Sequence, residues 1–244
     1  MRIAALYDIH GNLPALEAVL RDVRAEHIDL IVFGGDLLPG PLPRETLDCA
    51  LALDIPSRIL HGNGDRVVAE LIRGEKTTEV PERFREVMRW NAAQLTPADA
   101  DTIAAWPDTI ALDSGVGATL FCHATPRNDI DIFTRLTADE QIAPAFAGTS
   151  ADIVVCGHTH MQFDRRLAGR RVINAGSVGM PFGEPGAYWA LIDRDVELRR
   201  TEYDLQAAAE RIARSAYPEA RQFAEHNVLS PPSEAAMLAA FSRG

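Results

Sequence analysis

The first sixty residues alternate between short apolar runs and amphipathic segments. Residues 3–7, 30–33 and 58–60 form the apolar runs, each short enough to predict a buried strand. Residues 13–26 and 44–53 lie between these runs and carry apolar positions at i, i+3 and i+4, which is typical of a helix packed on a sheet. This strand–helix–strand order predicts that the strands pair in parallel.

The rest of the chain predicts a helical insertion, a second set of strands and a helical end. Residues 68–106 are charged and helical in pattern, and we interpret them as an insertion. Strand patterns then recur at residues 109–112, 119–122, 153–156, 163–167, 171–173, 188–192 and 196–200. We expect the last four strands to form an antiparallel meander and residues 205–244 to form a helical extension. Because the chain shows neither a repeat nor a flexible linker, we expect residues 1–244 to be one domain.

The amino-acid composition limits which classes of partner and which cellular location we expect for the protein. With 47% hydrophobic and 24% charged residues the chain is typical of a globular protein, and no stretch has the apolar length of a membrane span. The formal net charge of -11 argues against stable binding to a nucleic acid, since such binders usually present a basic face. A phosphate substrate is compatible with this charge, because bound cations would reverse the local field. The first residues predict a core strand rather than a cleavable leader, so we expect a cytoplasmic protein.

Residue types that bind metals follow the predicted strands. Five motifs stand at strand ends: Asp8-Ile9-His10, Gly35-Asp36, Gly62-Asn63-Gly64-Asp65, Cys122-His123 and Gly157-His158-Thr159-His160. Ligands bind at the carboxyl ends of the strands in open sheets with helices on their faces, so these motifs are expected to converge. Four of the seven histidines occur in them, an order that histidines with no common role would not show. The joint pattern therefore favours one metal site over several packed or solvated histidines.

The chemistry of the motif residues agrees with a metal site. Carboxylate, imidazole and amide oxygen ligands suit borderline or hard divalent ions. In Asp8-Ile9-His10 and in His158-Thr159-His160, a strand period of two would place both ligands on the same side. We therefore expect each pair to face the same crevice.

The ordered motifs resemble those of the calcineurin-like metallophosphoesterases. The resemblance covers roughly residues 1–193, and the run from Asp8 to Leu16 is similar to the small bacterial and archaeal phosphodiesterase branch. It implies an α/β fold, a two-sheet β-sandwich flanked by helices in four layers (α/β/β/α). It also implies two divalent metal ions, drawn from manganese, iron, zinc or nickel.

The same resemblance implies which residues bind each ion. The first ion would be bound by Asp8, His10 and His160, the second by Asn63, His123 and His158, and Asp36 would bridge the two. Two such ions, about 3.5 to 4 Å apart, would hold a bridging water as hydroxide for in-line attack on phosphorus.

One position departs from the resemblance. Many members of the family have a histidine directly after the metal-binding asparagine, and this histidine is thought to protonate the leaving oxygen. Gly64 stands there instead, and a glycine cannot donate a proton. General acid catalysis typically contributes about a hundredfold to ten-thousandfold, so its loss would favour substrates with good leaving groups. The candidate replacements as proton donor are His61 and Asp65.

Two further residues are candidate substrate contacts. Arg127 and Asn128 lie just beyond the predicted ligand His123, where a guanidinium or amide could reach the phosphate. An alternative for Arg127 is a surface ion pair with Asp129 or Asp131.

The leading functional hypothesis is a hydrolase of phosphodiesters of small molecules or nucleotides. A phosphomonoesterase is the nearest alternative, and a catalytically weak interaction scaffold of the same fold is the alternative from a different class. The C-terminal helices either close the fold or form a homo-oligomer contact, and the pattern does not distinguish the two.

Overall fold

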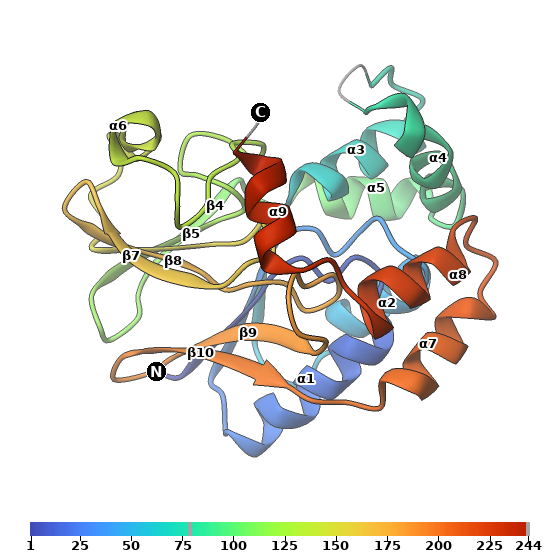
Figure 1. Ribbon diagram of the computed structural model, residues 1–244, viewed down its shortest axis with the longest axis horizontal. Coiled ribbons are helices and arrows are strands. Elements are labelled where there is room, and N and C mark those ends of the chain that lie inside the picture. Colours follow the sequence, from blue (N-terminus) through green and yellow to red (C-terminus); the bar gives the residue numbers. More distant parts are fainter. Residues whose placement is uncertain (78–79, 243–244) are drawn as a thin grey trace.

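The computed structural model describes residues 1–77 and 80–242 and contains two five-stranded β-sheets with helices on their outer faces (Figure 1). This confirms the predicted fold class. Residues 78–79 of the predicted insertion and residues 243–244 of the predicted C-terminal extension lie outside the described residues.

The first sheet has the strand order β10-β9-β1-β2-β3. Its parallel part consists of β1 (Ile3–Leu6), β2 (Leu30–Gly34) and β3 (Ser57–Leu60), linked by the helices α1 (Leu13–Ala25) and α2 (Pro43–Leu51). The predicted parallel pairing is thus confirmed. The side chain of Asn12 accepts a hydrogen bond from the backbone N–H of Ala15, so the loop after β1 passes directly into α1.

The second sheet has the strand order β4-β5-β6-β8-β7. Its strands are β4 (Thr109–Asp113), β5 (Ala118–Cys122), β6 (Ile153–Cys156), β7 (Phe163–Leu167) and β8 (Arg170–Asn174). The short helix α6 (Asp139–Ile142) and the 3-10 turn η2 (Ala143–Phe146) cover the outer face of this sheet.

The predicted four-stranded antiparallel meander is wrong. The strands do form two antiparallel hairpins, but β7–β8 joins the second sheet, whereas β9 (Ala187–Ile192) and β10 (Val196–Thr201) join the first. β8 pairs in parallel with β6, and β9 pairs with β1. Strand pattern alone does not reveal the sheet to which a hairpin belongs, because both sheets bury one face in the same core.

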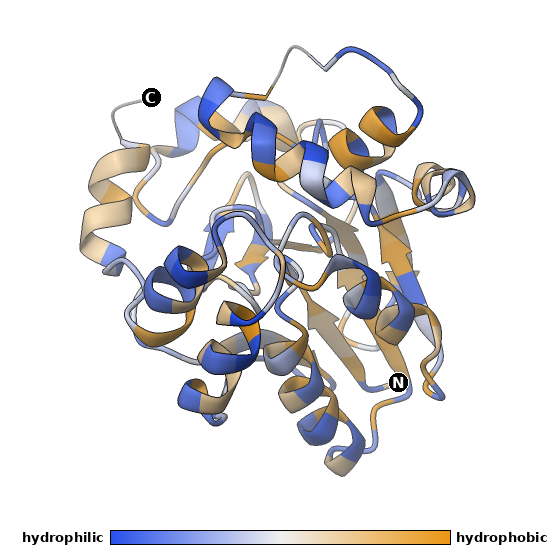
Figure 2. Cartoon of the chain, turned by 90° about the vertical axis from the view of Figure 1, so that its right-hand side faces the viewer, coloured by the Kyte–Doolittle hydropathy of each residue, from blue (hydrophilic) through white to orange (hydrophobic). Residues whose placement is uncertain are grey.

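Alternate residues in β1 and directly after it pack into two different hydrophobic clusters. Ile3, Ala5 and Tyr7 belong to the cluster between the sheets, whereas Ala4 and Leu6 pack with the cluster under α1 and α2. A strand buried on both faces is apolar at every position, which is why its sequence shows a continuous run. Figure 2 shows this contrast between apolar strands and helices with mixed surfaces.

Helices from two distant parts of the chain form a further layer at the strand ends. The insertion contributes η1 (Glu82–Phe84), α4 (Arg85–Ala93) and α5 (Pro97–Ala104), after α3 (Asn63–Ile72). The helical stretch therefore begins at Asn63 and not at residue 68. The C-terminal segment contributes α7 (Leu205–Ala213), α8 (Ala220–Phe223), the π-helix η3 (Ala224–Leu229) and α9 (Glu234–Phe241).

We call residues 82–93 and 205–229 the cap. They share a separate hydrophobic cluster that includes Val87, Ile212, Tyr217 and Phe223. The rings of Trp90 and Tyr217 meet edge to face with centroids 5.4 Å apart, which joins the insertion to the C-terminal segment. Within residues 1–77 and 80–242 no helix is long and apolar enough to cross a membrane.

Candidate metal centre

The structure brings the seven predicted metal ligands together at the carboxyl ends of the strands. They come from the loops after β1, β2, β5 and β6 and from the first residue of α3. Two groups of three among them have ligand atoms within 4.8 Å of one another: Asp8, His10 and His160, and Asp8, Asp36 and His123.

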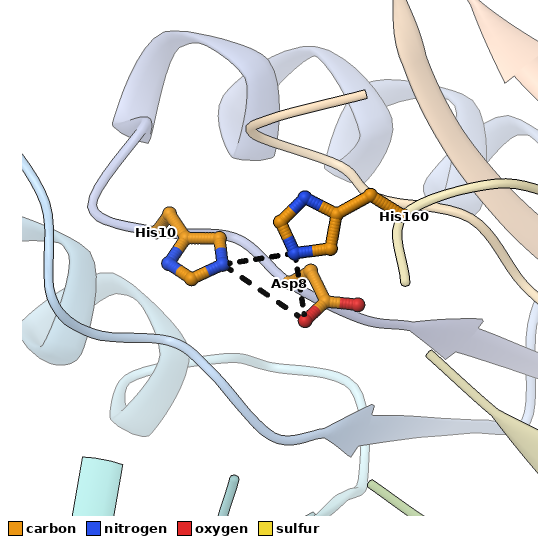
Figure 3. A group of neighbouring side chains, drawn as sticks. All are labelled: Asp8, His10 and His160. Carbon is orange, nitrogen blue, oxygen red and sulfur yellow. Dashed lines mark hydrogen bonds and ion pairs between the residues drawn. The ribbon is translucent and has the colours of Figure 1, made fainter. Parts of the chain in front are cut away.

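The first group points its side chains at a common centre (Figure 3). His10 Nε2 lies 3.2 Å from His160 Nε2. Asp8 Oδ1 lies 3.4 Å from His160 Nε2 and 3.9 Å from His10 Nε2. These are the three residues that the sequence predicts for the first ion.

The second set of predicted ligands converges on His123. Its Nε2 lies 3.2 Å from both Asn63 Oδ1 and His158 Nδ1. Asp36 Oδ2 lies between the two sets, 3.6 Å from His123 Nε2 and 3.6 Å from His10 Nε2. Asp36 thus lies within reach of a histidine of each set. Asp8 Oδ1, however, is also 3.9 Å from His123, so both carboxylates face both sets.

Hydrogen bonds to backbone carbonyls orient three of the histidine rings. The Nδ1 of His10, His123 and His160 donates to the carbonyls of Pro39, Gly34 and Met180, at 3.2, 3.0 and 2.7 Å. A carbonyl can only accept, so these contacts place the proton on Nδ1 and leave the Nε2 lone pair directed into the site. His158 instead presents Nδ1 to the centre.

The ligand loops adopt a backbone conformation that is uncommon for residues with side chains. Among the described non-glycine residues, seven have a positive φ, and five of these are predicted ligands: Asp8 (53°), His10 (46°), Asp36 (53°), His158 (64°) and His160 (57°). Such conformations cost about 1 to 3 kcal/mol each and cluster at functional sites.

The predicted reason for the paired ligands therefore needs correction. Asp8 and His10 do share a side of the crevice, but β1 ends at Leu6, before both of them. Their positive φ values, rather than a strand period of two, turn both side chains inward. The same holds for the histidine pair after β6.

The two central carboxyl groups are in unequal electrostatic states. Burial alone would raise the pKa of Asp8, but the imidazoles of His160, His123 and His10 hold it well below its usual range. Burial, aided by the charge of Asp8, raises the pKa of Asp36 to about 6 in spite of His123. Asp8 is therefore an anion throughout the physiological range, while Asp36 becomes one as the pH passes about 6.

The four histidines divide in the same way. Burial lowers the pKa of His10 and His158 to about 3, so both are neutral and have lone pairs available for a cation. Burial also disfavours the charged forms of His123 and His160, but the two central carboxylates outweigh it and raise their pKa values. A proton bound to His123 or His160 thus takes a position that a cation would otherwise occupy.

One buried atom supports the fit of a cation to this site. Asp8 Oδ1 is fully buried and has no hydrogen-bond partner among the described residues, whereas its Oδ2 accepts from the backbone N–H of His158 at 2.8 Å. A buried carboxylate oxygen without a partner is costly unless it binds a cation. Together with the converging lone pairs, it shows that these residues fit divalent metal ions.

The structure explains why a glycine stands at position 64. A Cβ at Gly64 would lie 2.5 Å from the carbonyl oxygen of Leu38 and 2.9 Å from Asp36 Oδ1. The backbone N–H of Gly64 also donates to that same oxygen of Asp36 at 2.8 Å. The close approach holds the central carboxylate in place, and any side chain at position 64, a histidine included, would require the backbone at Leu38 to shift.

A cavity of about 400 Å³ opens above the site. Its floor contains six residues of the centre: His10, Asp36, Asn63, Gly64, His158 and His160. Its walls come mostly from the cap, which contributes Phe84, Val87, Met88, Tyr217, Phe223 and His226 among others. The sequence offered no signal for His226, since no motif surrounds it and only tertiary packing places it over the centre.

The structure separates the candidate proton donors from this cavity. Asp65 is fully buried and both its oxygens accept backbone N–H groups, from Leu38 at 2.9 Å and Gly62 at 3.0 Å. Burial and the nearby Asp36 raise the pKa of Asp65 to about 7. His61 Nε2 pairs with Asp108 at 2.9 Å.

His61 and the candidate substrate contacts line a different cavity, of about 270 Å³, on the side of His123. There Arg127 Nη2 pairs with Asp131 at 2.8 Å, as the alternative interpretation predicted. Asn128 Nδ2 donates to the same carboxylate at 3.0 Å. The role of both residues in substrate binding stays a prediction.

Comparisons with known proteins match this architecture. A model of the calcineurin-like phosphoesterase superfamily domain matches residues 1–196. The uncharacterized protein MJ0912 of Methanocaldococcus jannaschii is 26% identical over 238 residues, which cover 89% of this chain and 94% of that protein.

Two crystal structures share the fold. A metallophosphoesterase from Sphaerobacter thermophilus has a TM-score of 0.74 and 25% identity, over 92% of this chain and 97% of its own. The hypothetical protein PH1004 from Pyrococcus horikoshii has a TM-score of 0.74 and 20% identity, over 95% of this chain and 99% of its own. Both alignments cover more of the chain than residues 1–196, so they extend into the C-terminal helices.

Proposed function

The chain belongs to the calcineurin-like phosphoesterase superfamily, and on that premise we propose that it hydrolyses phosphoesters with two divalent cations held at the strand ends. Phosphodiesters of small molecules or nucleotides are the favoured substrates. The observation that supports this most directly is the position of Asp36 Oδ2, 3.6 Å from a histidine of each ligand set. Two ions there would activate water and neutralise charge on the phosphoryl oxygens.

In this proposal the protein's own residues position the reaction. Asp8, His10 and His160 would hold the first ion, Asn63, His123 and His158 would hold the second, and Asp36 would be shared by both. The backbone carbonyls behind His10, His123 and His160 keep these three imidazoles in the tautomer that a ligand needs, so they require little reorganisation.

We assign the transfer of a proton to the leaving oxygen to His226. It lines the cavity that contains the metal ligands, whereas His61 lines the neighbouring cavity and Asp65 is engaged by two backbone amides. An imidazole donates and accepts protons near neutral pH, as a general acid must. A glycine beside Asn63 supplies no proton, so the proposal takes the donor from the cap side of the cavity.

The proposal is tested by metal reconstitution and hydrolysis. Metal-free protein would be loaded with manganese, iron, zinc or nickel, and bound metal would be counted by mass spectrometry. We expect two ions per chain and a higher kcat/KM for bis(4-nitrophenyl) phosphate than for 4-nitrophenyl phosphate. The reverse order would identify a phosphomonoesterase. No turnover on either ester with any metal would reject the hydrolase.

A further inference from the structure

The walls of the 400 Å³ cavity above the metal centre have a composition that limits what can bind there. None of the described residues that line it is a lysine or an arginine. The charged groups it contains are the carboxylates Asp36 and Glu219. A phosphate or carboxylate beyond the reacting group is usually bound by arginine or lysine, and here it would meet Glu219 instead.

Apolar side chains fill most of the wall. Phe84, Val87 and Met88 come from the insertion, and Tyr217 and Phe223 come from the C-terminal segment. Phe84 is 44% exposed, so part of its ring is available to contact a bound molecule. The guanidinium carbon of Arg83 lies over this ring, 4.7 Å from its centroid, but Arg83 is not among the residues that line the cavity.

Polar side chains other than carboxylates complete the wall. Gln222, His226 and Asn227 line the cavity, and their side chains make no hydrogen bond within the described part of the chain. They are available to bind polar edges of a neutral molecule. A cavity of this volume suits a single aryl group or a nucleoside.

We propose that the substrate is a phosphoester with an uncharged, largely apolar ester group of aryl or nucleoside size, which the cap holds in this cavity. The inference rests on the proposed phosphoesterase function and specifies its substrate class. Substrates with a second anionic group on that side are disfavoured, because the two cations would neutralise the reacting phosphate alone and the wall contains no arginine or lysine among the described residues.

Three matched diesters test the inference with the metal-loaded protein. They are 4-nitrophenyl phosphate diesters whose second ester group is methyl, phenyl or 4-carboxyphenyl. We expect kcat/KM for the phenyl diester to exceed both others by about tenfold or more, a range that apolar pockets commonly achieve. If the methyl or the carboxyphenyl diester were the better substrate, the inference would be overturned while the phosphoesterase function would stand.

A charge introduced into the wall sharpens the test. Gln222 is exposed at the cavity, so Gln222→Lys should fold and should raise kcat/KM for the carboxyphenyl diester about tenfold relative to the phenyl diester. Gln206→Lys makes the same change on an exposed position of α7 outside the cavity and should leave the ratio unchanged. An unchanged ratio in Gln222→Lys would overturn the placement of the ester group.

Binding gives a second measurement that does not depend on turnover. Calorimetry of the metal-loaded protein with phenylphosphonate, methylphosphonate and 4-carboxyphenylphosphonate should show the tightest binding for the first. Absence of all hydrolysis together with this order would reject the proposed enzyme and keep the inferred binding class. Equal affinities would reject the inferred class even if hydrolysis is observed.

Discussion

The ligand loops at the strand ends and the cap above them hold their side chains in opposite ways. In the loops, buried histidines are fixed by backbone carbonyls, and five ligands occupy strained positive φ angles. In the cap, the described side chains that face the same cavity are apolar or polar with Glu219 as their one carboxylate, and His226 and Gln222 are exposed.

This difference indicates that the loops and the cap have separate roles. The loops provide a rigid, charged arrangement suited to one kind of chemistry, because any displacement of a ligand costs metal affinity. The cap rests on its own hydrophobic cluster, so its cavity-facing residues can change without disturbing the loops. We therefore expect changes in the loops to affect every substrate, and changes in the cap to affect some substrates more than others.

The largest expected effect is the loss of the central carboxylate. Asp36→Asn should lower kcat/KM for all esters by at least about a thousandfold, because Lewis-acid stabilisation is worth several kcal/mol and each 1.36 kcal/mol is tenfold in rate. Bound metal should fall below two ions per chain. Asp54→Asn, at an exposed carboxylate away from the site, is the control. Full activity with one bound ion would break the assignment of Asp36 as the bridge.

A substitution in the cap should have a smaller effect on kcat, and one that depends on the leaving group of the ester. His226→Gln should lower kcat about a hundredfold for an ester with a phenolate leaving group, and much less for one with a 4-nitrophenolate leaving group, since only the poor leaving group needs a proton. His61→Gln is the matched comparison. If His61→Gln showed the leaving-group dependence and His226→Gln did not, the proton donor would lie in the other cavity.

A third effect concerns packing within the loops. Gly64→Ala places a Cβ against the carbonyl oxygen of Leu38 and should destabilise the protein by about 2 kcal/mol, as overpacking typically does. Metal affinity should fall as well, because Asp36 accepts from the N–H of residue 64. Thermal unfolding of metal-free and loaded protein measures both. Gly148→Ala, which has open space around its Cβ, should change neither.

The smallest expected effect is the release of protons when a metal ion binds, and only residues of the loops should contribute to it. The pKa of Asp36 is about 6, and those of His123 and His160 are raised, so these groups hold protons that cations must displace near pH 6. Manganese affinity should therefore rise with pH and level off once these groups are deprotonated. His10 and His158, with a pKa of about 3, should release none.

Calorimetric titration with manganese at pH 6, in two buffers of different ionisation enthalpy, measures the released protons. Tyr217→Ala, in the cap, should give the same number as the unchanged protein, since Tyr217 packs against Trp90 and not against a ligand. Affinity that is independent of pH would contradict the protonation states described for the loops.

Sequence reasoning predicted the parts of this molecule that depend on short segments. Strands such as β1 and β6 are continuous apolar runs because both their faces are buried, and the turns that follow them carry the ligands. Parallel strands end at the same edge of their sheet, so the predicted ligands of each sheet lie together, and the packing of the two sheets brings all seven to one site. The reason given for the pairing of Asp8 with His10 was nevertheless wrong, since backbone dihedral angles are not visible in a residue pattern.

Other features depended on contacts between segments that are distant in the chain. The hairpin β9–β10 pairs with β1 and does not continue the sheet from β8. The apolar pattern of β9 is compatible with either arrangement, so the pattern does not distinguish them. His226 lines the same cavity as His10, more than two hundred residues earlier, and the contact of Tyr217 with Trp90 joins the C-terminal segment to the insertion. The sequence by itself thus determined the ligands and the chemistry they suit, which local periodicity and strand ends specify. Tertiary packing alone decided what covers the metal centre. The cap is positioned by side-chain complementarity between helices that are remote in the chain, and no periodicity in the sequence indicates which remote helices pack together.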